Sequence, residues 1–413
     1  MNRTALLCTS IASLSLVAAA LVVAGPLNPP TGSVSSTYKT LTEVEPRIAI
    51  NSTNTPGDAD SLYQISQPGS YYLTANITGV SGRHGIEIAS SGVTIDLNGF
   101  QVLGVSGSLD GVRTISGYVG ISIRNGTVRG WGNSGVDLGL SGGAYSVVAD
   151  VRAGSNGLYG INVGPGTAVS RCEVWANVGR GIQAGNDCTI SQCLAYTNGG
   201  AIYVGSGCTI SECSAYGNAE GGVIAGNGCT ISGCSVYQNS GNGINAGNAC
   251  TITGSTVSSN SSNGITANGS NTISGCTSFS NSGDGIAAQF GCTISGCTVR
   301  YNSLDGIRIA GQCHVIGNDS VNNGNGSDGA GIHATSSDNR IESNNCIGAD
   351  RGIDVDATGN IIIKNTCSGN ASNWDVVANN VCLVVSATNA GAILGNSGGT
   401  APGSTDPSAN FTY

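Results

Sequence analysis

The sequence predicts an all-β protein, a right-handed parallel β-helix with about 21 residues per coil, on the basis of three observations. The segment GCTISGCSVYQNSGNGI at 228–244 returns almost unchanged at 291–307 as GCTISGCTVRYNSLDGI. Short apolar segments alternate with polar residues and are separated by Gly, Asn and Ser. Helical periodicity is absent throughout. A strand-and-turn repeat of this length is typical of a solenoid, in which each coil pairs with the next.

Four residue columns define the regular coils. They are a first cysteine column (Cys188, Cys208, Cys229, Cys250, Asn271, Cys292, Cys313), a second (Cys193, Cys213, Cys234, Ser255, Cys276, Cys297), an asparagine column (Asn177, Asn198, Asn218, Asn239, Asn260, Asn281, Asn302, Asn323) and an aliphatic column (Ile182, Ile202, Val223, Ile244, Ile265, Ile286, Ile307). The repeats have almost no leucine, which excludes a leucine-rich repeat. We therefore expect three short strands per coil, with the cysteines and isoleucines inward and the asparagines forming an amide ladder at a corner.

The flanking segments differ in composition from the coils. Residues 1–24 have the pattern of a secretory signal peptide, with Arg3 before an apolar run that ends in small residues; a retained membrane anchor is the alternative. Residues 25–60 are rich in Pro, Ser and Thr and are predicted to be an N-terminal cap or linker. The β-helix is predicted over 61–383, with the most regular coils at 171–325, and 384–413 is a low-complexity C-terminal tail. A four-residue insertion near 324–330 breaks the period.

Charge and hydropathy limit the possible partners. The chain has a formal net charge of −9 and only 9% charged residues, so it offers no basic face for nucleic acid. No segment after the signal peptide is apolar enough to span a membrane. We expect a secreted protein, extracellular or at the cell surface, whose partner is a polysaccharide or a cell-surface component.

The cysteines admit two interpretations. Disulfides are the obvious one in an oxidising compartment. However, cysteines stacked on neighbouring coils have Cβ atoms about 4.8 Å apart, whereas a relaxed bridge needs about 3.8 Å. We therefore expect most of them to be buried thiols that pack as small apolar side chains, with metal sites disfavoured because no CxxC or Cys/His spacing occurs.

Several segments resemble one family. SSGVTIDLNGF at 90–100, ISIRNGTVRGW at 121–131, DRGIDVDATGNIIIKN at 350–365 and the CTISGC coils are similar to bacterial secreted right-handed β-helix proteins of the pectate-lyase-like superfamily, from about residue 60 to 383. The resemblance implies the fold. It does not decide the activity, because that superfamily includes lyases, hydrolases and epimerases as well as members without established activity. The GHG, RIK and DPH motifs of its enzymes are absent, and RHG at 83–85 does not match.

Charged residues are concentrated in the C-terminal coils, with five between 172 and 282 and thirteen between 283 and 356. Taking Ile307, Ile332 and Ile353 as equivalents predicts one outward column, Arg308, His333 and Asp354, with Asp356 on the same face and Asp284 and Asp305 in a neighbouring column. In a lyase, Arg308 would bind a sugar carboxylate or act as the base and His333 would assist proton transfer, while Asp354 and Asp356 would hold calcium or orient His333. A hydrolase would use Asp284 and Asp305. The alternative is a solvated face with Asp at turns.

Two further outward columns are candidate binding faces. The aromatic column contains Trp175, Tyr196, Tyr216, Tyr237 and Phe279, with Ser258 and Arg300 in the same series, and offers rings to sugars or stacks on itself. The threonine column (Thr189, Thr209, Thr230, Thr251, Thr272, Thr293), with Ser or Thr two residues on, resembles an ice-binding array or is simply a good outward strand face.

Three functional hypotheses follow. The leading one is a secreted, non-catalytic β-helix that presents a repetitive face to polysaccharide or to a cell-surface partner, because no complete catalytic motif is present. The alternative is a polysaccharide lyase, or a glycoside hydrolase, acting on acidic polysaccharide, with calcium as a possible cofactor of the lyase. Ice binding is a minor alternative.

Overall fold

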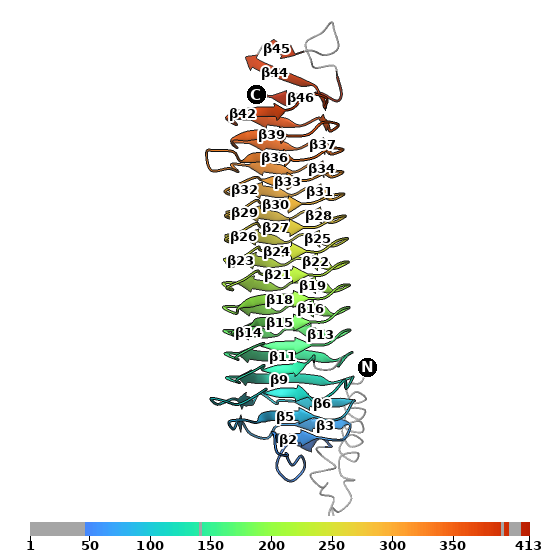
Figure 1. Cartoon of the computed structure of the whole chain (residues 1–413), viewed down its shortest axis with the longest axis vertical. Coiled ribbons are helices and arrows are strands. Elements are labelled where there is room, and N and C mark those ends of the chain that lie inside the picture. The colour runs from blue at the N-terminus through green and yellow to red at the C-terminus, as the bar shows by residue number, and fades with distance from the viewer. Residues whose placement is uncertain (1–45, 140–142, 390–391, 396–405) are drawn as a thin grey trace, which may run out of the picture. The chain divides into compact units, whose positions relative to one another are not determined.

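The computed structural model describes residues 46–139, 143–389, 392–395 and 406–413, and every regular element in this part of the chain is a β-strand. The strands lie in two sheets that wind together as stacked coils, with parallel pairing of strands throughout except for one antiparallel pair near the C-terminus (Figure 1). The predicted signal peptide and most of the 25–60 segment fall outside the described residues. Within these residues no helix is long and apolar enough to cross a membrane.

One sheet takes a single strand from each of 15 successive coils in the described residues. Its strands are β2 (Ser61–Ile65), β5 (His84–Ile88), β8 (Val112–Thr114), β10 (Val136–Leu138), β12 (Ile161–Val163), β15 (Arg180–Ala184), β18 (Gly200–Val204), β21 (Val223–Ala225), β24 (Ile244–Ala246), β27 (Ile265–Ala267), β30 (Ile286–Ala288), β33 (Ile307–Ile309), β36 (Ala330–Ala334), β39 (Arg351–Val355) and β42 (Ser372–Val376). We call it the 15-stranded sheet.

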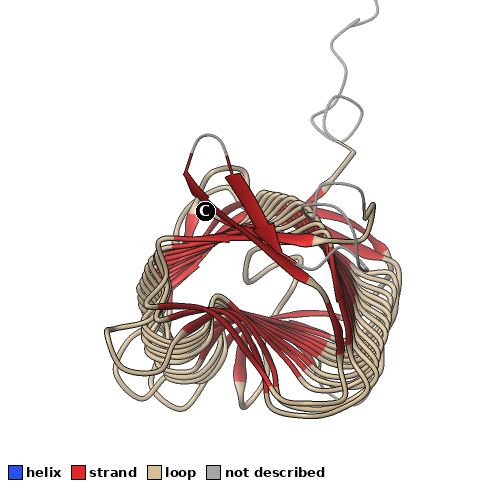
Figure 2. Cartoon of the chain, turned by 90° about the horizontal axis from the view of Figure 1, so that it is seen from above, coloured by secondary structure: helices blue, strands red, loops and turns tan. Residues whose placement is uncertain are grey.

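The other sheet contains the remaining strands of the coils, two from each regular coil. They are β1 (Ile48–Ala49), β3 (Gly69–Tyr72), β4 (Ile77–Thr78), β6 (Val93–Asp96), β7 (Gln101–Leu103), β9 (Ser122–Arg129), β11 (Val147–Gly154), β13 (Ala168–Ser170), β14 (Glu173–Trp175), β16 (Thr189–Ser191), β17 (Leu194–Tyr196), β19 (Thr209–Ser211), β20 (Ser214–Tyr216), β22 (Thr230–Ser232), β23 (Ser235–Tyr237), β25 (Thr251–Thr253), β26 (Thr256–Ser258), β28 (Thr272–Ser274), β29 (Thr277–Phe279), β31 (Thr293–Ser295), β32 (Thr298–Arg300), β34 (His314–Ile316), β35 (Asp319–Val321), β37 (Arg340–Glu342), β38 (Asn345–Ile347), β40 (Ile361–Ile363), β41 (Thr366–Ser368), β43 (Val381–Cys382), β44 (Val384–Asn389), β45 (Ala392–Gly395) and β46 (Asn410–Thr412). Viewed along the stack, the strands of successive coils superimpose and the loops form the corners (Figure 2).

The core has the predicted inward columns. Ile182 and Ile190 are fully buried, and Cys188 and Cys193 of the same coil are 1% and 2% exposed. The described part of the chain contains 15 free cysteines, all buried except the half-buried Cys382, so the buried-thiol interpretation is the one that this structure adopts.

The asparagine column is a buried ladder. Asn239 Nδ2 donates to Oδ1 of Asn260 at 3.0 Å and to the carbonyl of Ala215, while its Oδ1 accepts from the backbone N–H of Asn218. Each amide thereby satisfies corner groups of two coils, as the sequence predicts. A second such ladder runs through Asn318, Asn344 and Asn365 to Asn410.

The predicted insertion lengthens a single coil by four residues. Ile286 pairs with Ile307, 21 residues on, whereas Ile307 pairs with Ile332, 25 residues on. The four extra residues lie in the loop between β35 and β36, which projects beside the stack (Figure 1). In the segment predicted as a tail, β46 pairs in parallel with β41 and β44.

Candidate functional site

The outward side chains at the middle of each strand of the 15-stranded sheet form one continuous column. We call it the central column; it contains Gln64, Glu87, Arg113, Asp137, Asn162, Gln183, Tyr203, Ile224, Asn245, Thr266, Ala287, Arg308, His333, Asp354 and Asp375. Charge occurs only toward its two ends, and the stretch from Asn162 to Ala287 has none. The column therefore carries two separate polar clusters.

The C-terminal cluster surrounds a pocket of about 250 Å³. Its lining residues are Asp284, Leu304, Asp305, Arg308, Ser327, Asp328, Gly329 and His333. The structure pairs Arg308 with His333 and His333 with Asp354, which is the register that the aliphatic column predicts. The inserted loop contributes Ser327, Asp328 and Gly329, so the break in the repeat supplies one side of the pocket.

Asp284 and Asp305 continue a ladder of turn residues. Asn242 Oδ1 accepts from the backbone N–H of Asn263, and Asn263 Oδ1 accepts from that of Asp284 at 2.8 Å. In the same way Asp284 Oδ1 accepts from the N–H of Asp305 at 3.2 Å. Asp305 Oδ1 accepts from the N–H of Ala330 at 2.8 Å. We call Asn242, Asn263, Asp284 and Asp305 the turn ladder; it fixes one oxygen of each carboxylate and leaves the second for other contacts.

The two carboxylates have different surroundings. Burial and then the charge of Asp305 raise the pKa of Asp284 to about 6, although Arg308 and His333 oppose this shift. Asp305 Oδ2 instead forms an ion pair with Nδ1 of His333 at 2.8 Å. Asp284 therefore exchanges a proton near neutral pH, and Asp305 is held by a cation.

His333 lies between carboxylates. Its Nε2 is 3.0 Å from Oδ2 of Asp356 and 3.8 Å from Oδ2 of Asp354. Burial lowers the pKa of this imidazole, but the hydrogen bonds to Asp305 and Asp356 outweigh burial and raise it to about 9. At neutral pH the ring is a cation with both N–H groups engaged, so it orients Asp305 rather than accepting a proton.

The donor set at Asp354 and Asp356 does not favour the calcium site considered from the sequence. Asp354 Oδ2 accepts from Nη1 of Arg351 at 2.9 Å, and Asp356 is paired with the imidazolium of His333. Burial is the main cause of a raised pKa at Asp354, which Arg351 and His333 counteract. Calcium needs six to eight oxygen ligands, and these carboxylates already face protein cations.

Arg308 differs from the other cations of this cluster. Its side chain is exposed, it lines the pocket, and among the described residues no ion pair or hydrogen bond involves its guanidinium. Arg351, by contrast, bonds Asp328, Asp354 and Asp375. Arg308 is thus the cation that remains for an anionic ligand.

The aromatic column is in register, but its rings lie against one another. Tyr196 and Tyr216 have ring centroids 5.3 Å apart and Tyr216 and Tyr237 4.9 Å apart, with interplanar angles of 6° and 7°. The guanidinium of Arg152 lies 5.3 Å from the ring of Trp175. Phe279 is half-buried two coils beyond Tyr237, with the buried Ser258 between them. Stacking therefore covers both faces of Tyr216 and one face each of Tyr196 and Tyr237.

Sequence reasoning missed the N-terminal cluster. Glu87 and Arg113 are adjacent in the central column, and His84 and Asp110 lie beside them. The coils here are longer than 21 residues, so no repeat register pointed to these neighbours. The alternation of Ile86, Glu87 and Ile88 was the available signal that Glu87 faces outward.

The geometry and the comparisons define the class of protein. Parallel coils of near-constant length with an inward aliphatic column make this chain a right-handed parallel β-helix protein. The family described as "Right handed beta helix region" matches residues 159–291 and, in a second overlapping match, 204–346. No curated protein sequence matches the chain.

Solved structures with the same kind of fold are distant. The A-module of the mannuronan C-5 epimerase AlgE4 of Azotobacter vinelandii is 15% identical, with a TM-score of 0.45, over 76% of this chain and 91% of that chain. The Dettilon tailspike protein is 17% identical, with a TM-score of 0.32, over 74% of this chain and 58% of that chain. The periplasmic alginate epimerase AlgG is 14% identical, with a TM-score of 0.39, over 84% and 82%.

Proposed function

We propose that this protein is an exported glycoside hydrolase that cleaves an acidic polysaccharide in the pocket at Asp284 and Asp305. The observation that carries the proposal is the presence of two carboxyl groups in different surroundings at one pocket. The pKa of Asp284 is raised to about 6, and its ladder neighbour Asp305 is ion-paired with His333. Two carboxyl groups in contrasting environments are the arrangement that glycosidic bond hydrolysis uses.

The chemistry assigns one role to each group. Protonated Asp284 donates its proton to the glycosidic oxygen as the bond to the anomeric carbon breaks. Asp305 Oδ2 forms a bond to that carbon, while His333 and the N–H of Ala330 keep the carboxylate in position. Water then attacks the anomeric carbon and gives its proton to Asp284, while the bond from that carbon to Asp305 Oδ2 breaks and Asp305 leaves as a carboxylate. Neighbouring coils are about 4.8 Å apart, which is close to the carboxyl separation of about 5–5.5 Å in retaining enzymes.

The substrate class follows from Arg308 and the shape of the site. Arg308 is exposed at the pocket and is available for a sugar carboxylate. The uncharged stretch of the central column beside the pocket presents Asn245 and Thr266, whose polar side chains suit the hydroxyls of an extended chain. A linear polysaccharide can therefore lie along the coils with one of its sugar units in the pocket.

Elimination receives less support than hydrolysis. A lyase needs a group that is unprotonated at its working pH to take the C5 proton. His333, with its pKa raised to about 9, is already protonated, and both ring nitrogens face carboxylates. Calcium could neutralise the carboxylate of a uronate in a lyase, but Asp354 and Asp356, already paired with Arg351 and His333, do not favour binding it.

The non-catalytic and ice-binding hypotheses depend on two other outward columns, the aromatic column and the threonine column. The stacked rings of Tyr196, Tyr216 and Tyr237 present mostly edges rather than free faces, which weakens the aromatic column as a sugar platform. The threonine column is in register from Thr189 to Thr293, and most of its members are exposed. Strand preference accounts for that array equally well.

The test is a product analysis. The chain from residue 25 onward is incubated with pectate, alginate and a neutral polysaccharide, and both new reducing ends and unsaturated sugar acids are measured. We expect reducing ends without unsaturation from an acidic polymer, with retained anomeric configuration in early products. Unsaturated products would replace hydrolysis with elimination. Binding without any product would replace catalysis with presentation of a face.

Asp284→Asn separates catalysis from folding. The amide oxygen still accepts the N–H of Asp305, as Asn263 does for Asp284, so the turn ladder survives. We expect the rate to fall by about 10²- to 10⁴-fold, the usual contribution of an acid–base group. Stability at pH 7 should rise by about 1–3 kcal/mol, because a buried carboxyl with a raised pKa destabilises the folded state above pH 6. Asn248→Ala, at an exposed corner outside the turn ladder, is the control whose rate should stay unchanged.

A further inference from the structure

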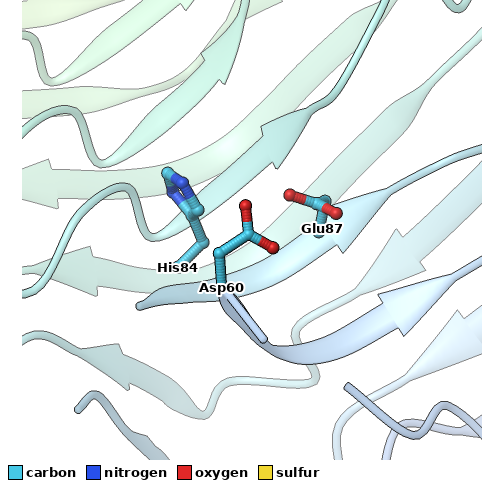
Figure 3. A group of neighbouring side chains, drawn as sticks. All are labelled: Asp60, His84 and Glu87. Atoms are coloured by element: carbon cyan, nitrogen blue, oxygen red, sulfur yellow. The ribbon is translucent and has the colours of Figure 1, made fainter. Parts of the chain in front are cut away.

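We propose that Asp60, His84 and Glu87, at the N-terminal end of the 15-stranded sheet, form a binding site for a transition-metal dication such as zinc. One ligand atom from each residue lies within 4.8 Å of the other two. Two ligands of one ion at bond lengths of about 2.1 Å are about 4 Å apart or less, so only small side-chain shifts are needed. Figure 3 shows the carboxylate of Asp60 between His84 and Glu87.

The backbone places these three groups on adjacent coils. His84 and Glu87 come from β5, three residues apart, and Asp60 immediately precedes β2. Ser61 pairs with His84 and Gln64 with Glu87, so the two coils are in register at the site. An ion here would join the first two coils of the sheet, where the stack ends and each coil has fewer neighbours.

A buried, unpartnered carboxylate oxygen points to a ligand. The side chain of Glu87 is 3% exposed, and its Oε1 accepts from Nε2 of Gln64 at 3.0 Å. Its Oε2 is buried without a hydrogen-bond partner, and Nε of Arg113, 3.7 Å away, is likewise buried and unpartnered. The two atoms form an ion pair that is too long for a hydrogen bond. A buried charged oxygen without a hydrogen-bond donor is costly, and a metal ion would remove this cost.

His84 has Asp110 at one ring nitrogen and Arg113 at the other. Its Nδ1 accepts from the backbone N–H of Asp110 at 3.0 Å and lies 3.2 Å from Oδ2 of the same residue. Its Nε2 lies 2.7 Å from Nη1 of Arg113, which can only donate, so Nε2 presents its lone pair to that cation. An ion that takes the place of Arg113 would meet this lone pair, with the ring proton on Nδ1 and donated to the Asp110 carboxylate. The guanidinium of Arg113 thus occupies the position beside His84 and Glu87 that a metal ion would take, and it must move aside when an ion binds.

The donor set selects the kind of ion. One imidazole with two carboxylates suits zinc or manganese, whereas calcium prefers oxygen ligands only. The surroundings contain further carboxylates: Asp110 lies beside His84, and Asp137 follows Arg113 in the central column. One guanidinium among these carboxylates leaves an excess of negative charge that favours a dication.

The C-terminal group His333, Asp354 and Asp356 has the same donor types and provides an internal comparison. There, both ring nitrogens of His333 are engaged by Asp305 and Asp356, and Arg351 bonds Asp354. No carboxylate oxygen of this group is buried without a partner. We therefore expect metal to bind at the N-terminal cluster and not at this one.

The experiment measures metal binding to tag-free protein, because a histidine tag would itself bind zinc. Chelator-treated chain from residue 25 is dialysed against Zn²⁺, and metal content is measured per chain. Free Mn²⁺ is followed in parallel by electron paramagnetic resonance, because manganese avoids the thiols that zinc could reach in unfolded molecules. We expect one equivalent of metal and a rise in melting temperature on binding.

Four variants decide between a metal site and a structural ion pair. Glu87→Gln, which is nearly isosteric, and His84→Ala should each lower the affinity at least 10-fold. Asp110→Asn should lower it about 10- to 100-fold, as loss of an orienting carboxylate does. Arg113→Gln should raise it, because the competing cation is gone. A merely structural cluster would not give this increase. His333→Ala serves as the control with unchanged binding.

Three results would overturn the proposal. They are absence of bound metal in the wild-type chain, equal binding by Glu87→Gln, and weaker binding by Arg113→Gln. Far-ultraviolet circular dichroism of each variant shows whether it has folded. If His84→Ala does not fold, the opposite effects expected of Glu87→Gln and Arg113→Gln still decide the question.

Discussion

The regular coils up to residue 282 and the more highly charged C-terminal coils, 283–356, build the same turn ladder from different side chains. In the regular coils, Asn242 and Asn263 accept the backbone N–H of the next coil through a neutral amide oxygen. In the C-terminal coils, Asp284 and Asp305 accept the same N–H groups through a carboxylate. Replacing the amide nitrogen with a second oxygen leaves the backbone contact intact and adds a charge at the pocket.

The comparison indicates how this repetitive fold would acquire the chemistry that we propose. The ladder fixes the position of each carboxylate before any substrate binds, so the site inherits its rigidity from the coils below it. Partners outside the ladder then set the proton affinity of the groups: burial raises the pKa of Asp284, and Asp305 and Asp356 raise that of His333. The regular coils have the same geometry without these neighbours.

The largest effect is expected in the regular coils. Asn239→Leu removes the acceptor of Asn218 N–H and the donor to the Ala215 carbonyl, and both groups are buried. We expect a loss of about 3–5 kcal/mol, since each buried unsatisfied group costs about 1–3 kcal/mol. The shift of the urea unfolding midpoint measures it. Asn248→Ala, in the same coil but exposed, should cost much less because water replaces the lost contact. Equal losses in both variants would contradict the ladder's structural role.

A smaller effect is expected in the C-terminal coils, where His333 should stabilise the folded state by up to about 3 kcal/mol in a pH-dependent way. The pKa of His333 is raised in the folded state to about 9, above the ordinary value of 6.5. The stabilisation is therefore fully present below about pH 6.5 and is lost as pH rises through 9. Unfolding midpoints of the wild type and of His333→Gln should differ most near pH 6 and converge by pH 10. A difference independent of pH would mean that His333 contributes packing alone.

The smallest effect concerns the cysteine columns of the regular coils. Cys234→Leu should destabilise by about 1–3 kcal/mol, because the stacked column has room for small side chains only. Cys234 is 2% exposed, and its neighbour in the stack, Ser255, is also a small buried side chain. Cys234→Ala should be milder. Denaturant unfolding of both variants tests the order, and a more stable leucine variant would show a cavity that the stacking argument does not anticipate.

Much of the fold could be predicted from particular residues. The cysteine, asparagine and isoleucine columns have a constant period, and a period of this kind allows only stacked coils. The register of Arg308, His333 and Asp354 was also predictable across the insertion, because Ile307, Ile332 and Ile353 must stay inward. The N-terminal cluster was not, since Asp60, Glu87 and Arg113 lie in coils of unequal length, where no column connects them.

The sequence by itself determined the periodic features of this protein, namely the coil, its inward and outward columns, and the pairing of like with like. Only the tertiary structure decided the environments. It placed Ser327 and Asp328 of the inserted loop at the pocket, buried Asp354 beside His333, turned the tyrosine rings against each other, and left Glu87 Oε2 without a hydrogen-bond donor. The physical reason is that a repeat specifies which backbone groups pair, whereas burial, ion pairing and proton affinity depend on neighbours about 20 or more residues away in the chain.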